Sequence, residues 1–217
     1  MNVSHLHKAR QSRSRDSQER LLRAAAELLL DRFWEGISIA DIAQHAGLSV
    51  GGFYARFKSK DALLHVLHEE YEKKRTTHFR RFFQTHDPGA PLADRVAALV
   101  DLVADWMRDH RGVLRTFLLR AWSAPESFDP DFGDNLGEVY TQARDYLAGN
   151  RGEDSETMPN DAVRVAIHVL AATCRDALVL KRGSRSSTLG LADKPFKREM
   201  TRVLLSYLRP AAGQHYS

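Results

Sequence analysis

The chain has one cysteine, seven prolines and no long hydrophobic run among its 217 residues. A single cysteine, Cys174, excludes a framework of intrachain disulfides and suits a reducing compartment, so we expect a cytoplasmic protein. Cys174 stands in an apolar helical run, which favours a buried side chain over a redox sensor. No apolar stretch approaches the roughly 18 residues that span a bilayer, and the basic N-terminus lacks the apolar core of a secretory signal. We therefore expect a soluble chain with no membrane partner.

Strand-like alternation of polar and apolar residues is also missing, and no segment repeats. Apolar residues recur instead at helical spacing, as in Leu22, Ala25, Ala26, Leu29 and Phe33. This spacing predicts an all-α fold of about nine helices. The expected helices span residues 16–34, 39–46, 50–57, 59–84, 91–109, 112–122, 131–147, 161–181 and 194–208, with loops at 125–130, 149–160 and 183–191.

The chain has little excess of one charge over the other, because 32 basic and 28 acidic side chains give a formal net charge of only +4. Residues 1–60 hold 10 Lys and Arg against 6 Asp and Glu, whereas residues 61–217 hold 22 of each. A basic end on an otherwise balanced chain points to a polyanion such as DNA. Residues 1–15 predict a flexible basic arm, which is either an untidy terminus or a segment that lies in a minor groove.

The stretch from Ser38 to Phe57 predicts two short helices joined by a tight turn. Ser38 is a good N-cap, and Asp41 three residues later completes an approximate capping box. Gly47 ends the first helix, because glycine readily adopts the left-handed conformation of a helix stop, and Ser49 caps the second. This order of parts is that of a helix-turn-helix unit, whose second helix enters the major groove of DNA.

The second of these helices has an unusually bare outward face. At about 100° per residue, Phe53 and Phe57 form the buried side, and Gly51 and Ala55 lie opposite. Each glycine costs about 1 kcal/mol relative to alanine in a helix, so we interpret the bare face as a surface for close approach to a duplex. A plain helical hairpin that binds nothing is the alternative. The residues predicted to bind DNA are Ser38, Ser49, Val50, Gly51, Gly52, Tyr54, Arg56 and Lys60.

The segment RLLRAAAELLLDRFWEGISIADIAQHAGLSVGGFYARFKSKDALL resembles the N-terminal DNA-binding domain of the TetR family of bacterial transcription regulators. The resemblance covers about residues 16–76 and implies three helices, the third of which reads an operator. Ser49, Tyr54 and Lys60 match the family's usual contact positions. The chain departs from the family pattern at Gly52, Ala55 and Arg56.

The clearest break in the chain is the run His86-Asp87-Pro88-Gly89. We predict a flexible arm at 1–15, a DNA-binding domain at 16–76 with its motif at 38–57, and a second domain at 77–217. The resemblance implies that this second domain binds a small-molecule effector and forms a homodimer, and that the helix at 59–84 links the two domains.

Apolar residues cover more than one face of the last two helices. We expect part of this surface to face a second subunit, as the resemblance also implies, and a core within one chain is the alternative. The predicted interface residues are Ile167, Leu170, Cys174, Met200, Leu204 and Tyr207.

The middle helices carry aromatic residues that either fill the core or, as the resemblance implies, line an effector pocket. Arg115 and Arg120 pair either with an acidic ligand or with Asp105 and Asp109. The predicted pocket residues are Trp106, Arg115, Phe117, Arg120, Trp122 and Tyr140.

Enzyme chemistry finds little support. Residues 47–51 read GxSxG, but that nucleophile motif requires a preceding strand and here follows a helical segment. His65, His68 and Glu69 share a helix face in the order HxxHE, which is neither HExxH nor HxxEH, so we expect exposed polar residues instead of a metal site. We expect no catalytic site, no cofactor and no bound metal.

The sequence thus predicts a repressor that binds a palindromic DNA operator as a dimer and is released by an unidentified small-molecule effector. Two alternatives remain open. One is an all-helical enzyme or binding protein with a vestigial DNA domain, and the other is a protein that coats DNA without sequence preference.

Overall fold

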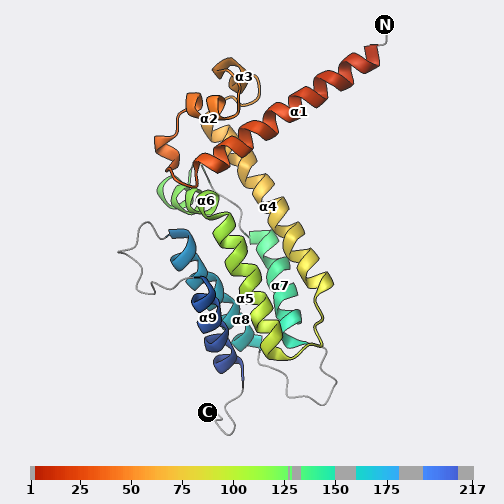
Figure 1. Ribbon diagram of the computed structural model, residues 1–217, viewed down its shortest axis with the longest axis vertical. Helices are drawn as coiled ribbons and strands as arrows, with labels where there is room; N and C mark the ends of the chain where they lie inside the picture. The colour runs from red at the N-terminus through yellow and green to blue at the C-terminus, as the bar shows by residue number, and fades with distance from the viewer. Residues whose placement is uncertain (1–2, 127, 129–132, 150–159, 181–192, 210–217) are drawn as a thin grey trace. The chain divides into compact units, whose positions relative to one another are not determined.

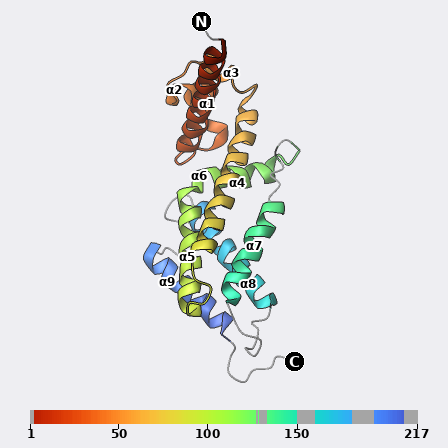
Figure 2. The same ribbon diagram turned by 90° about the vertical axis from the view of Figure 1, so that its right-hand side faces the viewer.

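The computed structural model describes residues 3–126, 128, 133–149, 160–180 and 193–209, and all their side chains except those of 3–13 and 133–136. Every regular element in these ranges is helical, so the predicted all-α class is confirmed (Figures 1 and 2). The elements are α1 (Val3–Leu28), the 3-10 helix η1 (Trp34–Gly36), α2 (Ile39–His45), α3 (Val50–Tyr54), α4 (Lys60–Thr85), α5 (Leu92–Asp109), α6 (Arg111–Ser123), α7 (Gly133–Ala148), α8 (Asn160–Cys174), the π-helix η2 (Arg175–Leu180) and α9 (Asp193–Leu208).

Helix α1 differs most from the sequence prediction. It begins at Val3, within the segment predicted as a flexible arm, and ends at Leu28 instead of Trp34. No glycine or proline occurs before Gly36, so nothing in the sequence interrupts a helix once its packed second half has formed. The early end is also understandable, because the carbonyl groups of Leu29 and Arg32 accept hydrogen bonds from Arg115.

Helix α3 is shorter than expected and ends at Tyr54. The amide of Phe57 still donates to the carbonyl of Phe53 over 3.0 Å, so Phe57 stays on the predicted buried side. The remaining helices begin and end within two residues of their expected bounds, if η2 is counted as the continuation of α8. Most of the loop expected at 149–160, and all of the loop at 183–191, lie outside the described residues.

The chain divides into two compact units. Unit 1 comprises Met1–Lys73 and Gly112–Pro130, and unit 2 comprises Lys74–Arg111 and Asp131–Ser217. This division places most of α6 with the N-terminal unit, although the sequence assigned it to the second domain. The predicted functional division between 16–76 and 77–217 stays a prediction. The core of unit 1 joins fully buried residues of α1, α2, α3 and α4, namely Leu21, Ala25, Ile42, Phe53, Leu63 and Leu64.

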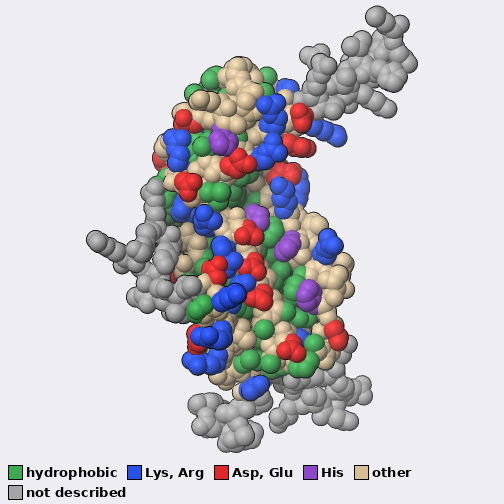
Figure 3. All heavy atoms as spheres, in the orientation of Figure 1, with side chains coloured by type: hydrophobic (Ala, Val, Ile, Leu, Met, Phe, Trp, Pro, Cys, Tyr) green, Lys and Arg blue, Asp and Glu red, His purple; other side chains and the backbone are tan. Residues whose placement is uncertain are grey.

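Unit 2 is organised around α5, which packs against α7, α8, η2 and α9. Val96 and Val100 of α5 are buried at its centre. Lys197 of α9 pairs with Asp101 and Asp105 of α5 at 3.1 and 2.8 Å. Acidic and basic side chains are interspersed on the face shown in Figure 3. The ion pairs therefore line the outside of an apolar α5–α9 contact.

Candidate nucleic-acid interface

Helix α2 begins at a complete capping box. The amide of Asp41 donates to the Ser38 hydroxyl over 3.0 Å, and the amide of Ser38 donates to the Asp41 carboxylate over 2.8 Å. Arg32 lies 3.2 Å from the same carboxylate. The bonds from the Ser38 amide and hydroxyl, with the nearby Arg32, hold the pKa of Asp41 below its ordinary value. The predicted capping box is confirmed, and it fixes the start of the helix-turn-helix unit.

The turn between α2 and α3 is a Schellman motif. Gly47 has a φ of +64°, as predicted for the residue that stops α2. The amide of Gly47 donates to Gln44 over 3.0 Å, and the amide of Leu48 donates to Ala43 over 2.8 Å. Arg20 of α1 donates to the carbonyl of Gly47 over 3.0 Å, so the turn is also tied to the body of unit 1.

Helix α3 is anchored on one side and open on the other. Ser49 caps it by accepting the amide of Gly52 over 3.1 Å. Phe53 is fully buried, whereas Val50 and Tyr54 are 43% and 55% exposed. A Cβ at Gly51 would meet only the Ser49 hydroxyl at 3.7 Å, which is ordinary contact. Packing within the described chain therefore gives no reason for glycine at this position.

Two predicted contact residues are engaged within unit 1. The ammonium of Lys60 donates to the carbonyls of Trp34 and Ile37 at 2.6 and 2.8 Å and lies 4.5 Å from the Trp34 ring centre. Its burial lowers the pKa of Lys60. Arg56 donates from Nε to the carbonyl of Ser14 in α1 over 3.2 Å. Both side chains therefore help to position the helices of the motif, and their contact with DNA stays a prediction.

Helix α6 holds the C-terminal end of α1. A Cβ at Gly112 would lie 2.4 Å from the carbonyl oxygen of Leu29, so no side chain fits there. The buried Arg115 donates to that same oxygen over 2.8 Å and to Arg32 O over 3.3 Å, and lies 5.0 Å from the Phe33 ring centre. Arg115 thus closes the end of α1 in this structure, and its predicted role in a ligand pocket stays a prediction.

The predicted pocket residues are distributed over both units. Arg115, Phe117, Arg120 and Trp122 belong to unit 1, whereas Trp106 and Tyr140 belong to unit 2. Phe117 is buried against rings, Arg120 pairs with Asp61 at 3.3 Å, and Trp122 is 89% exposed. Helical spacing located these side chains on helices but carried no information on the partners across the fold.

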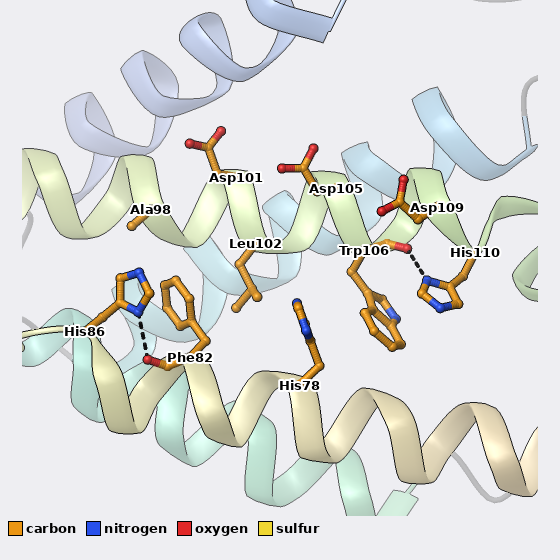
Figure 4. A pocket seen from close by; sticks show the side chains of 10 residues that line it. All are labelled: His78, Phe82, His86, Ala98, Asp101, Leu102, Asp105, Trp106, Asp109 and His110. Atoms are coloured by element: carbon orange, nitrogen blue, oxygen red, sulfur yellow. Dashed lines mark hydrogen bonds between the residues drawn. The ribbon is translucent and has the colours of Figure 1, made fainter.

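Unit 2 contains a groove of about 500 Å³ between α4 and α5 (Figure 4). We name it the imidazole groove after its residues His78, Phe82, His86, Leu102, Trp106 and His110. Figure 4 shows Asp101, Asp105 and Asp109 on the side of α5 that faces away from α4. Of the residues predicted for a pocket, only Trp106 lines this groove.

Ring stacking builds the groove. Trp106 stacks on His110 at 3.8 Å and on His78 at 5.0 Å, and Phe82 stacks on His86 at 3.8 Å. The Nδ1 atoms of His86 and His110 each lie 2.9 Å from the carbonyl oxygen of the residue four positions earlier. Burial lowers the pKa of His110. The sequence analysis missed these histidines, although an aromatic residue four positions before a histidine, as in Phe82–His86 and Trp106–His110, was a usable signal.

The six predicted interface residues are also placed by the structure. Leu170, Cys174, Met200 and Leu204 are buried within unit 2, so they belong to the core of the single chain. Ile167 is half-buried, and Tyr207 is 50% exposed. The large apolar side chains that α8, η2 and α9 leave exposed are Val165, Leu180, Val203 and Tyr207.

The motifs considered for catalysis take structural roles. Ser49 of the GxSxG run caps a helix. His65 and His68 contact aromatic rings. Within the described side chains, no group of three or more His, Cys, Asp or Glu residues is placed to hold a metal ion. Among the described residues, no helix combines the length and the apolar character needed to cross a bilayer.

Comparison with known proteins identifies the N-terminal region. The sequence pattern described as "Bacterial regulatory proteins, tetR family" matches residues 21–67. The uncharacterized HTH-type transcriptional regulator YwcC of Bacillus subtilis is 40% identical over 57 residues, which are 26% of this chain and 26% of that relative. The chain therefore matches about a quarter of the length of this curated relative.

Solved structures extend the likeness to the fold of most of the chain. A regulator of the TerR/AcrR family from Aquifex aeolicus has a TM-score of 0.60 at 19% identity, covering 88% of this chain and 98% of that one. A putative TetR-family regulator from Mesorhizobium loti has a TM-score of 0.62 at 16% identity, covering 90% of this chain and 96% of that one. The fatty acid degradation regulator FadR from Bacillus halodurans has a TM-score of 0.61 at 16% identity, covering 89% of this chain and 96% of that one. At such identities the likeness shows the fold.

The capped α2, the Schellman turn and the open α3 define a helix-turn-helix domain of the kind found in DNA-binding transcriptional regulators. Within the chain, residues 21–67 match the N-terminal domain of the tetR family of bacterial regulatory proteins. The curated relative is described as an HTH-type transcriptional regulator, which favours a regulatory role over the enzyme alternative.

Proposed function

We propose that the chain is a dimeric repressor whose α3 enters the major groove of a palindromic operator and which a small molecule releases. The observation that carries the proposal is the open face of α3, where Gly51 and Ala55 are exposed and Gly51 has room for a side chain. A helix face without side chains lets the backbone approach base edges and phosphates closely.

The test of DNA binding is Gly51→Leu. Because the space around Gly51 is open, we expect the variant to keep its thermal midpoint but to lose most of its affinity for a duplex selected from a random pool. Gly137→Leu in α7 is the control, since its added Cβ also has open space and meets nothing within 4 Å, and it should bind as the parent does. Equal affinity of both variants would contradict the proposal, and equal binding of selected and random duplexes would favour the DNA-coating alternative.

For the dimer, we propose an interface formed by Val165, Leu180, Val203 and Tyr207 in place of the buried residues expected from the sequence. A two-fold dimer supports the function because it places two copies of α3 on two half-sites. Val203 is 52% exposed, so Val203→Asp should produce monomers that remain folded, as measured by light scattering and circular dichroism. Arg198→Asp, about 140° away around α9, is the control that should stay dimeric.

For the effector, we propose the imidazole groove, whose volume lies within the usual range for small-molecule sites. Its stacked rings suit a flat, largely apolar molecule. An effector that prefers the released conformation weakens operator affinity tenfold for each ~1.4 kcal/mol of differential binding. A panel of planar aromatic compounds should contain some that raise the thermal midpoint of the parent and weaken its DNA binding. Neither effect should occur in Ala98→Phe, which fills the groove.

A further inference from the structure

The net positive charge of the chain comes from its first fifteen residues. This segment contains Lys8, Arg10, Arg13 and Arg15 and no acidic residue. The rest of the chain holds 28 basic and 28 acidic side chains, so the entire formal excess of +4 lies before Asp16. The helix-turn-helix itself is therefore close to neutral. The excess positive charge that attracts a polyanion to this chain therefore comes from the N-terminal segment.

The backbone places this segment beside the recognition helix. Helix α1 starts at Val3, and its Ser14 carbonyl accepts a hydrogen bond from Arg56, which follows α3 by two residues. Residues 3–14 thus leave the domain next to the end of α3 (Figures 1 and 2). At 1.5 Å per residue they reach about 18 Å from that point, which is several base pairs along a duplex.

The segment has few apolar residues that could pack on the protein. Its only apolar residues from 3 to 14 are Val3, Leu6 and Ala9. At about 100° per residue, Arg10 and Arg13 fall on one side of the helix and Lys8 falls on the other. With three apolar residues among twelve, the segment gains little stability from hydrophobic packing, whereas phosphate neutralisation would stabilise it as a helix.

We propose that residues 3–14 form a cationic helical arm that binds the phosphate backbone of a DNA duplex beside the groove occupied by α3. A helix is about 10–12 Å wide and the minor groove is about 6 Å wide, so a helical arm lies on the phosphates and does not enter that groove. The arm adds affinity without sequence preference and adds salt dependence. This inference rests on the proposed DNA binding by α3.

The test is the variant Lys8→Gln, Arg10→Gln, Arg13→Gln, compared with the parent by fluorescence anisotropy on a selected and a random-sequence duplex. If three phosphate contacts are lost per chain, the slope of log K against log salt becomes shallower by about 2.7 per chain on both duplexes. The preference for the selected duplex should stay unchanged. The control Lys74→Gln, Arg81→Gln, Lys194→Gln removes the same charge from exposed positions elsewhere and should leave the slope as in the parent.

A second variant, Ala9→Pro, keeps every charge but interrupts the helix. It should lose part of the added affinity, and unchanged binding by this variant would overturn the helical form of the arm. An unchanged salt slope in the triple variant would overturn the arm itself. If the parent does not prefer the selected duplex, the proposed function fails. If that preference holds and the slope does not change, only the arm inference fails.

Discussion

The two units use charged side chains in different ways. In unit 1, Arg20, Lys60 and Arg115 donate to backbone carbonyls at the ends of helices or turns. In unit 2, the cations that contact α5 from outside pair with carboxylates, as Lys197 does with Asp101 and Asp105. A hydrogen bond from a charged group contributes about 1.5–3 kcal/mol, whereas an exposed ion pair contributes about 0–1 kcal/mol. These three residues of unit 1 are therefore stronger constraints than Lys197 of unit 2, although unit 1 also contains ion pairs such as Arg120–Asp61.

Unit 2 also contains a buried arginine that donates to a helix end. Arg95 is buried and donates to the carbonyls of Tyr146 and Leu147 at the end of α7, over 2.8 and 2.9 Å. Gly149 follows with a φ of +74°, and a Cβ there would meet the Arg95 guanidinium at 2.2 Å. The glycine and the arginine together close the helix. Where unit 2 needs a fixed helix end, it uses the arrangement of unit 1.

The largest effect should come from Gly112→Ala in unit 1. The new Cβ would lie 2.4 Å from a backbone oxygen of Leu29, and only a backbone shift relieves such a clash. We expect the free energy of unfolding to fall by about 3 kcal/mol, measured by urea titration. Gly137→Ala in unit 2 meets nothing within 4 Å and should raise it by roughly 0.5–1 kcal/mol. Similar changes in both variants would remove the contrast between the α6–α1 contact and the open side of α7.

The next effect compares Arg115→Met with Lys197→Met. Removing Arg115 leaves the buried carbonyl of Leu29 without its donor. We therefore expect the free energy of unfolding to fall by about 2 kcal/mol, and salt should not alter this loss. Removing Lys197 ends ion pairs with two half-exposed carboxylates, and the loss should be below about 1 kcal/mol. Repeating the titrations in 1 M salt should shrink only the Lys197 effect. A larger loss from Lys197→Met would reverse the comparison.

The smallest effect concerns pH. The pKa of Asp41 is lowered in the folded state, so its ionised form stabilises the fold above the ordinary carboxyl pKa, and this contribution is lost as the pH falls through the folded value. The thermal midpoint of the parent should therefore exceed that of Asp41→Ala at pH 6, and the difference should shrink in acid below about pH 4. A difference that stays constant from pH 6 to pH 2.5 would show that the carboxylate charge is not what matters.

The sequence predicted most helices and the turn of the motif because these depend on neighbours along the chain. Ser38, Asp41 and Gly47 act on groups within five residues, and each was assigned its structural role correctly. Phe53 and Phe57 lie on the buried side that helical spacing indicated. The start of α1 was missed because a polar, basic segment was interpreted as flexible, although it contains no residue that stops a helix.

What the sequence did not predict depends on distant partners. Arg115 looked available for a ligand because its acceptor, Leu29, is 86 residues away. Leu170 and Leu204 looked available for a second subunit because periodicity finds an apolar face but does not say what covers it. In unit 2 the chain covers that face itself, and smaller apolar positions such as Val165 and Val203 remain exposed.

Cys174 is a natural probe of how often unit 2 opens. It is the only thiol of the chain, it is fully buried, and burial raises its pKa to about 12. Alkylating reagents attack the thiolate, so the folded protein resists them both by enclosing the sulfur and by keeping it protonated. The rate of alkylation in the native protein then counts how often this bundle opens. A compound that stabilises the closed form of unit 2 would therefore lower the alkylation rate of Cys174, and no introduced label is needed to measure it.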